Sequence, residues 1–199
     1  MEYEVLIENK HESSLNGNYY IVDKKQNISI KKYKKGIKEG EWLNFYSLFN
    51  DIKLTSTTNY VKGKLHGYFF RTDNHTYYEE GYYKNGKKYR LWTKKYFDKD
   101  ILETENYNKS GKKHGDYTKI DFEFEEKEII SYKNGRKHGK YYLENKKYKT
   151  TIKGTYRNNL KHGIWTTKDE YLTKINEDGT ETPSIKKECY KNGKILKIK

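Results

Sequence analysis

The sequence contains no alanine and only one proline, one methionine and one cysteine in 199 residues. Alanine is the strongest helix former, so its absence disfavours long helices, while abundant tyrosine and isoleucine favour strands. The lone Cys189 cannot form an internal disulfide, and no apolar run is long enough for a membrane span or a signal peptide. We therefore expect a β-rich protein of the reducing cytoplasm.

Hydrophobic residues are also in short supply. The mean hydropathy is −1.25, 35% of the residues are charged and the formal net charge is +14, values that border on those of disordered chains. Aromatic residues nevertheless make up 16% of the chain, and each can bury about 150–250 Å². The composition predicts a folded body with a thin, aromatic-rich core.

A short pattern recurs along the chain, and its most regular copy is YKNGRKHGKY at residues 132–141. Aligning the copies on their first glycine gives successive steps of 27, 23, 25, 24, 24 and 34 residues. Such spacing is the signature of a repeat protein. The aligned positions are Gly36, Gly63, Gly86, Gly111, Gly135, Asn159 and Gly193.

Two columns of aromatic residues accompany these positions, and we expect both to build the core. One aromatic residue stands three positions before the first glycine, or four where Ser110 is inserted, and another stands six positions after it except in the last copy. The first column is Tyr33, Tyr60, Tyr83, Tyr107, Tyr132, Tyr156 and Tyr190, and the second is Trp42, Phe69, Trp92, Tyr117, Tyr141 and Trp165.

Each copy predicts one β-hairpin. A strand ends near the tyrosine, and the following Asn-Gly or Lys-Gly pair supplies the positive φ of a tight turn, which Asn159 also tolerates. A second glycine, interrupted once by Arg90, is expected to lie near the start of the return strand and to let neighbouring aromatic columns approach closely. In the fourth copy, residues 121–130, DFEFEEKEII, alternate as in a strand with one apolar and one acidic face.

These repeats define the expected organisation. Residues 1–32 are expected to form capping strands and a degenerate half repeat, and residues 33–168 five or six hairpin repeats of about 24 residues. Residues 169–199 are expected to form an inserted loop and a degenerate capping repeat, whose open edge at residues 194–199 offers a route to a homodimer. The predicted fold is all-β, an elongated, curved antiparallel array of hairpins in a single domain.

The pattern Tyr-x-x-Gly-x-x-x-Gly-x-aromatic, with Lys-His-Gly before the aromatic residue, resembles the MORN repeat, and the 24-residue spacing resembles its bacterial variant. The resemblance covers about residues 33–199, with departures at Arg90, Asn159, the Ser110 insertion and the last copy. It implies hairpins packed side by side into a sheet that serves as a binding surface. Bacterial members of the family are often described as antitoxin-like.

The candidate catalytic and metal-binding residues are few. Zinc sites need three or four convergent ligands, whereas a single column of side chains presents them in a line. No serine or cysteine stands in a recognisable nucleophile context, and no glycine loop has phosphate-binding spacing. We therefore expect no catalysis, no metal and no cofactor, and we expect the histidine column to satisfy turns and cover the next tyrosine. This column is His66, His114, His138 and His162.

Positive charge is the remaining signal. Basic residues follow the first glycine in most copies, so they should line one edge as a ridge that attracts an anionic partner. Lysine predominates over four arginines, which favours contacts with a phosphate backbone over base readout. The alternative is that these lysines only keep the array soluble and its edges unpaired. The candidate partner-binding residues are Lys64, Lys87, Lys88, Lys112, Lys113, Arg136, Lys137 and Lys161.

Three functions follow from these features. The first is a non-catalytic protein that grips and blocks or scaffolds one protein partner, as an antitoxin, immunity protein or inhibitor of a bacterial or phage defence enzyme would. The second is a backbone-directed binder of RNA or DNA with tyrosines as stacking platforms, and the two merge if the partner is a nucleoprotein. The third, attachment to an anionic membrane, is disfavoured because the sequence has no amphipathic helix or lipidation signal.

Overall fold

The structure is a computed structural model that describes residues 4–6, 15–23, 25–48, 51–73 and 75–196. The described residues do not include 1–3, 7–14 and 24 of the expected N-terminal cap or 197–199 of the expected open edge. The chain divides into two compact units. Unit 1 comprises residues 1–94 and 109–111, and unit 2 comprises residues 95–108 and 112–199.

Both units are built from β-strands joined by turns, and no helix occurs in the described residues. Unit 1 contains β1 (Glu4–Leu6), β2 (Gly17–Val22), β3 (Ile28–Lys34), β4 (Ile37–Lys38), β5 (Gly40–Leu48), β6 (Asp51–Val61), β7 (Lys64–Thr72), β8 (Tyr77–Lys84) and most of β9 (Lys87–Tyr96). Unit 2 contains β10 (Ile101–Tyr107), β11 (Gly115–Asp121), β12 (Glu126–Lys133), β13 (Arg136–Asn145), β14 (Thr150–Arg157), β15 (Leu160–Ile175), β16 (Glu181–Lys191) and β17 (Lys194–Leu196).

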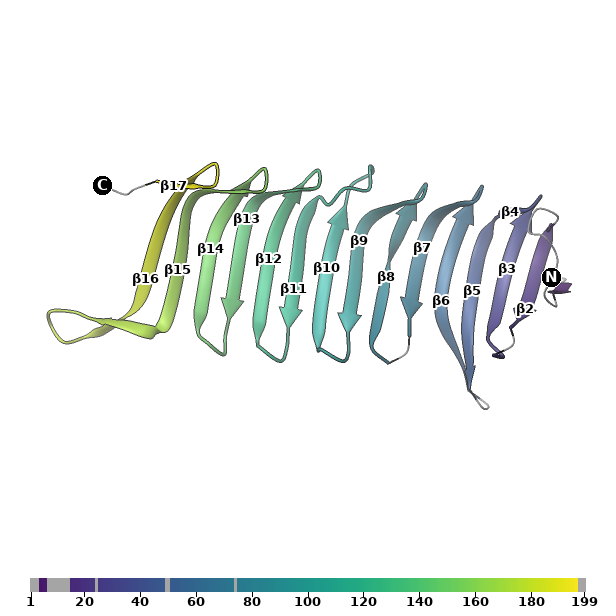
Figure 1. Cartoon of the computed structure of the whole chain (residues 1–199), viewed down its shortest axis with the longest axis horizontal. Helices are drawn as coiled ribbons and strands as arrows, with labels where there is room; N and C mark the ends of the chain where they lie inside the picture. Colours follow the sequence, from purple (N-terminus) through teal and green to yellow (C-terminus); the bar gives the residue numbers. More distant parts are fainter. Residues whose placement is uncertain (1–3, 7–14, 24, 49–50, 74, 197–199) are drawn as a thin grey trace. The chain divides into compact units, whose positions relative to one another are not determined.

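Strands that follow one another in sequence lie side by side within each unit (Figure 1). Consecutive strands pair antiparallel, for example β7 with β8 in unit 1 and β13 with β14 in unit 2. The described exception is β1, which pairs with β2 in parallel. The predicted all-β arrangement of antiparallel hairpins is therefore confirmed.

The first-glycine position lies in a two-residue turn except in the fourth copy, where five residues separate the bridged Tyr107 and Lys113. In unit 2, Lys133 pairs with Arg136 across Asn134 (φ 52°) and Gly135 (φ 85°). Two successive residues with positive φ define the type I′ turn, whose twist matches that of the flanking strands. Asn159 replaces the glycine at φ 70°, because asparagine tolerates this conformation better than most residues. The predicted turn chemistry is confirmed here.

The second glycine has a different role from the one we expected. Strand β13 begins at Arg136, directly after the turn, and Gly139 lies three residues into it at φ 101°. The register between β12 and β13 shifts between Ile130 and Tyr132, opposite this point. The second glycine therefore forms a β-bulge that requires positive φ. The return strand begins at this glycine in two repeats, at Gly40 and Gly115, and three residues before it in the repeats of Gly67, Gly139 and Gly163.

Close approach to an aromatic ring occurs at two other glycines. A Cβ built on Gly67, a second-column glycine, would meet only the side chain of Asn59, at 3.4 Å. A Cβ on Gly81 or Gly154 would instead overlap the indole of Trp92 or Trp165. These glycines lie beneath the two tryptophans, so the close packing expected at the second column takes place one strand away.

The stretch predicted to be an amphipathic strand contains a turn. Residues 122–125 form the turn between β11 and β12, with Glu125 at φ 48°. The carboxylate of Asp121 accepts a hydrogen bond from the backbone N–H of Phe124 at 3.1 Å and so caps this turn. Phe122 and Phe124 are consequently exposed. The alternation of apolar and acidic residues could not reveal this turn, because side-chain capping by aspartate competes with continuation of the strand.

The long spacing after Trp165 is occupied by an extended hairpin. Strand β15 runs for 16 residues and β16 for 11, joined by a turn at residues 176–180. Pro183 lies within β16 opposite Thr173, beside a register shift between Asp169 and Thr173. The inserted residues thus continue the sheet of unit 2.

The aromatic columns lie on one face of each unit, called the aromatic face below. In unit 1 the ring centroids of Tyr33 and Trp42 are 5.0 Å apart, and those of Trp42 and Tyr60 are 4.9 Å apart. In unit 2 Trp165 lies 5.0 Å from Tyr141 and 5.1 Å from Tyr156. These separations fall in the range of favourable aromatic pairs, so the rings form the thin core predicted from composition.

Successive hairpins are also joined through their turns. In most copies the N–H of the aligned glycine position donates to a carbonyl two residues beyond the preceding turn, which satisfies a donor that a two-residue turn leaves free. In unit 1 Gly86 donates to Leu65 at 2.7 Å, and in unit 2 Gly135 donates to Lys113 at 2.7 Å and Asn159 to Lys137 at 2.9 Å. The turns of one unit therefore stack in a ladder.

Candidate functional site

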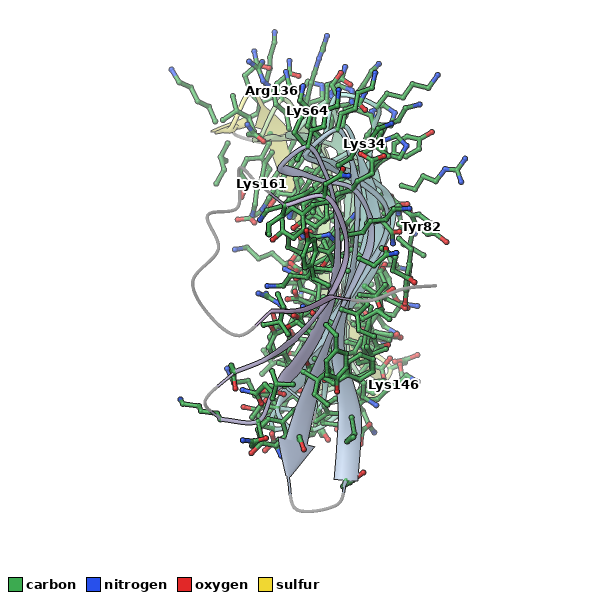
Figure 2. All side chains as sticks on the ribbon, turned by 90° about the vertical axis from the view of Figure 1, so that its right-hand side faces the viewer. Lys34, Lys64, Tyr82, Arg136, Lys146 and Lys161 are labelled. Carbon is green, nitrogen blue, oxygen red and sulfur yellow. The ribbon has the colours of Figure 1, made fainter. Side chains whose placement is uncertain are left out.

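The turns at one edge of each unit carry the candidate binding residues, and this edge is called the turn edge. It consists of residues 33–39, 60–66, 83–89, 107–114, 132–138, 156–162 and 190–196. Glu39 is the only carboxylate in these segments, and its Oε2 accepts the N–H of Lys62 at 2.9 Å. Side chains with terminal nitrogens dominate this edge, where Figure 2 labels Lys34 and Lys64 in unit 1 and Arg136 in unit 2.

Half of the predicted basic ridge projects outward. The four residues that directly follow the first glycine are exposed. Three of them begin strands β7, β9 and β13, and Lys112 precedes β11. We call them the outward column: Lys64, Lys87, Lys112 and Arg136. Their side chains are available to a partner.

The other half of the ridge lies over the core. These residues come one position later, so strand alternation turns them onto the aromatic face, where each ammonium group lies over a ring. The inward column comprises Lys88 (3.8 Å from the centroid of Trp92), Lys113 (5.4 Å from Tyr132), Lys137 (5.2 Å from Tyr156) and Lys161 (4.3 Å from Trp165). The structure therefore divides the eight predicted residues into two groups with different surroundings.

Two lysines of the inward column also form ion pairs. Lys88 Nζ lies 2.7 Å from Glu79, and Lys113 Nζ lies 2.6 Å from Glu105. Both carboxylates are only 8% exposed, and a buried carboxylate requires a partner of opposite charge. These two lysines therefore stabilise the fold by pairing with buried carboxylates. Sequence reasoning missed the pairing because the acids stand on the preceding strand, outside the turn pattern.

A hollow of about 410 Å³ opens at the turn edge of unit 2. Its charged lining is basic, with Arg136 and Lys112 from the outward column and Lys133 from the end of β12. Asn134, His138 and Asn158 complete it with hydrogen-bonding groups. Lys133 was not among the predicted residues, because only residues after the first glycine were assigned to the ridge. The Lys-Asn-Gly sequence at the turn was the signal that could have identified it.

The opposite edge of unit 2 carries both carboxylates and lysines. Its four-residue turns, 97–100, 122–125 and 146–149, form a second ladder in which Phe122 donates to Asp100 at 3.0 Å and Lys146 to Glu125 at 3.0 Å. Asp98, Glu123 and several exposed aromatic side chains stand in these turns. Figure 2 shows Lys146 at this edge, far from Arg136. Charged residues of unit 2 are therefore basic at its turn edge and of both signs at the opposite edge.

The histidine column is part of the turn stack. His114 Nδ1 accepts the N–H of Asn134, the first residue of the next turn, at 3.4 Å. Glu39 and Asn16 do the same for Lys62 and Lys35 in unit 1. His66 and His162 have a buried Nδ1 without a hydrogen-bond partner among the described residues. A turn-capping role therefore accounts for His114.

Catalytic and metal-binding arrangements were also sought in the described part of the chain. Within it, no three His, Cys, Asp or Glu side chains converge closely enough to hold a metal ion. Cys189 is a half-buried free thiol. None of the elements that the structure describes is a helix that could cross a membrane.

The tyrosines of the aromatic face are held in their neutral form. Burial raises the pKa of Tyr60 and Tyr83 in unit 1 and of Tyr117, Tyr132, Tyr141 and Tyr156 in unit 2. The Glu103 carboxylate, which accepts the Tyr117 hydroxyl at 3.0 Å, raises that pKa further. Glu128 acts in the same way on the pKa of Tyr141. Both carboxylates stabilise the protonated phenol.

Comparison with known proteins gives no relative. No protein-family model matches the sequence, and no curated protein matches it significantly. The repeat pattern and the surfaces described above are therefore the basis of the function proposed below.

Proposed function

We propose that the chain is a non-catalytic binding protein of the MORN-repeat type, which holds an acidic macromolecular partner against its turn edges. By this proposal it acts as an antitoxin, immunity protein or inhibitor, blocking or scaffolding a protein or nucleoprotein partner such as a bacterial defence nuclease. The repeat wording at residues 132–141 and its relatives supports the family assignment.

The outward column carries the proposal. Lys64, Lys87, Lys112 and Arg136 are exposed and belong to turns in which Glu39 is the only carboxylate. Within the described part of the chain none of the four takes part in an ion pair, so their positive charges are not neutralised by neighbouring side chains. Charges of the same sign at each turn edge steer an oppositely charged partner and raise its association rate.

Co-purification from the source organism tests this function. The wild-type chain should recover one stoichiometric protein. A variant carrying Lys64→Gln, Lys87→Gln, Lys112→Gln and Arg136→Gln should lose it, because the steering charges are gone while the inward column and the core remain.

The matched control is Lys99→Gln, Lys146→Gln and Lys147→Gln, which removes exposed lysines from the opposite edge of unit 2. This control should retain the partner. Recovery of no protein by the wild type, or equal recovery by the outward-column variant, would contradict the proposal.

A nucleic-acid backbone is the second candidate partner, and the basic hollow of unit 2 favours it. Lys112, Lys133 and Arg136 surround a space of about 410 Å³ that suits a phosphate group. Fluorescence anisotropy with a labelled 20-nucleotide RNA should then show binding that weakens by orders of magnitude between roughly 50 and 200 mM salt. Absence of binding at the lower salt concentration removes this candidate.

A further inference from the structure

The third repeat departs from the others at two adjacent positions. Tyr89 and Arg90 stand where most copies have His-Gly. Arg90 lies at φ 63°, the conformation that Gly67, Gly115 and Gly139 adopt in the same bulge. Left-handed backbone is unfavourable for any residue with a Cβ. Glycine at this position would therefore give a more stable fold than arginine does.

The Arg90 side chain is held in place without being neutralised. Its guanidinium lies 5.2 Å from the centroid of the Tyr89 ring, and this cationic group beside the phenol lowers the pKa of Tyr89. Within the described part of the chain, Arg90 takes part in no ion pair. An ordered, unpaired guanidinium retains donors for a bidentate acceptor.

Arg90 borders a hollow of about 290 Å³ on the face of unit 1 opposite the aromatic face. Tyr68 and Tyr82, paired across β7 and β8, form one wall with ring centroids 5.7 Å apart. Leu91, which is 50% exposed, and Thr93 line the rest. Figure 2 shows Tyr82 projecting from the sheet into solvent.

The hollow has a polar group on its lining. Glu80 accepts the hydroxyl of Tyr68 at 2.9 Å. Burial and this carboxylate together raise the pKa of Tyr68 to about 12. Tyr68 therefore stays a neutral donor, and the remaining oxygen of Glu80 can accept one more hydrogen bond.

One corresponding pair of unit 2 is polar and mutually satisfied, whereas another is formed by Ile164 and Cys189. Asp116 and Ser131 stand where unit 1 has Tyr68 and Tyr82, and the Ser131 hydroxyl donates to Asp116 at 2.6 Å. The repeat can therefore be built without exposed aromatic side chains at this place. Exposed apolar surface and a backbone outlier at one site are features of functional surfaces.

We propose that this hollow is the anchor site for a protein partner, which inserts a tyrosine or tryptophan next to an aspartate or glutamate. The inserted ring packs between Tyr82 and Leu91, and its O–H or N–H donates to Glu80. The neighbouring carboxylate binds Arg90. This inference deepens the proposed function, because it names the partner chemistry that the hollow recognises.

The hollow suits a protein better than a nucleic acid. Tyrosine and arginine are the residues that dominate binding energy at protein interfaces. The lysines of the turn edge, including Lys84 and Lys87, add attraction for an acidic partner segment.

A random dodecapeptide library displayed on phage and selected on the immobilised full chain tests this inference. Enriched peptides should carry tyrosine or tryptophan within three positions of an acidic residue. A synthetic peptide of that sequence should bind the wild type and lose about tenfold or more in affinity on Tyr82→Ser and on Arg90→Gly.

Arg90→Gly separates binding from folding. Glycine at φ 63° removes the unfavourable backbone conformation, so the urea midpoint of this variant should rise or stay unchanged while peptide binding falls. Tyr148→Ser, which removes an equally exposed tyrosine from the opposite edge of unit 2, should leave binding unchanged.

Three results would overturn the inference: no enrichment, enriched peptides that bind both hollow variants as well as the wild type, or a labelled 20-nucleotide RNA that binds at Tyr82 and Arg90 instead. Failure of the proposed function is distinguishable from these. Partner capture that depends on the outward column but not on Tyr82 or Arg90 removes only the anchor site, whereas the reverse dependence removes only the turn-edge proposal.

Discussion

At the scale of single residues, glycine has two separate roles in this chain. One set, including Gly135 and Gly139, is required by positive φ in turns and bulges. The other set, Gly81 and Gly154, has ordinary backbone angles but lies beneath a tryptophan. The first set was predictable from its spacing. The second was not, because it depends on which residue the neighbouring strand places opposite.

Gly154→Ala should destabilise the protein by about 2–3 kcal/mol, because the added methyl group overlaps the indole of Trp165 and forces the ring or the strand to move. Urea unfolding followed by tryptophan-independent circular dichroism measures this. In a Trp165→Leu background the same substitution should have a much smaller effect, since the overlapping ring is absent. Additive losses in the double variant would contradict the packing explanation.

At the scale of elements, hairpins are joined by turn ladders as well as by strand pairing. The N–H groups of a two-residue turn have no partner within their own hairpin, and the preceding repeat supplies one backbone carbonyl and one side-chain acceptor. The sequence indicated that histidine satisfies the turn. It could not show that the satisfied turn belongs to the next repeat, since spacing gives no information on contacts between copies.

His114→Ala should lower the free energy of unfolding by about 0.5–1 kcal/mol, the usual contribution of one hydrogen bond, because the Asn134 N–H loses its acceptor. His114→Glu should restore most of this, as Glu39 caps the turn of the next hairpin in unit 1. Chemical denaturation gives both values. His75→Ala, at an exposed histidine outside the column, is the control, and an equal loss there would contradict the capping role.

We predict that the folded protein becomes less stable at high pH, because the aromatic face contains buried tyrosines. Burial raises the pKa of Tyr117 and Tyr141, so the unfolded chain loses these phenolic protons first, near pH 10, and stability falls as the pH rises through the folded pKa values. Urea midpoints at pH 9 and pH 11 measure the fall. Tyr117→Phe with Tyr141→Phe should reduce it, whereas Tyr148→Phe, at an exposed tyrosine, should not. An unchanged fall in the double variant would contradict this explanation.

At the scale of the whole molecule, much of the fold was predictable because its sequence pattern is periodic. Hairpin turns, strand class and the aromatic columns follow from residues such as Tyr132, Gly135 and Tyr141 that recur in register. The turn at Phe122 and the ion pairs of Lys88 and Lys113 were not predictable, because they depend on local capping and on neighbours in space. The sequence showed Arg90 only as an interruption of the second glycine column. The hollow beside it could be found only from the structure.

The division of the basic ridge has the largest consequence for function. Sequence position alone placed eight residues on one ridge, whereas alternation along the strand leaves only the outward column free to meet a partner. Lysines of the inward column are occupied by rings and by buried carboxylates such as Glu79 and Glu105. Substitutions in the two columns should therefore affect different properties, namely partner binding for the outward column and stability for the inward column.

The most direct test of the turn-edge proposal is the dissociation constant of the complex with the co-purified partner, measured at about 50 and 200 mM salt. Wild type and the Lys99, Lys146 and Lys147 control should bind alike and weaken together as salt rises. The variant with glutamine at Lys64, Lys87, Lys112 and Arg136 should bind at least about tenfold more weakly at the lower salt concentration and respond less to salt. Equal affinity and equal salt dependence in all three proteins would contradict a partner held at the turn edge.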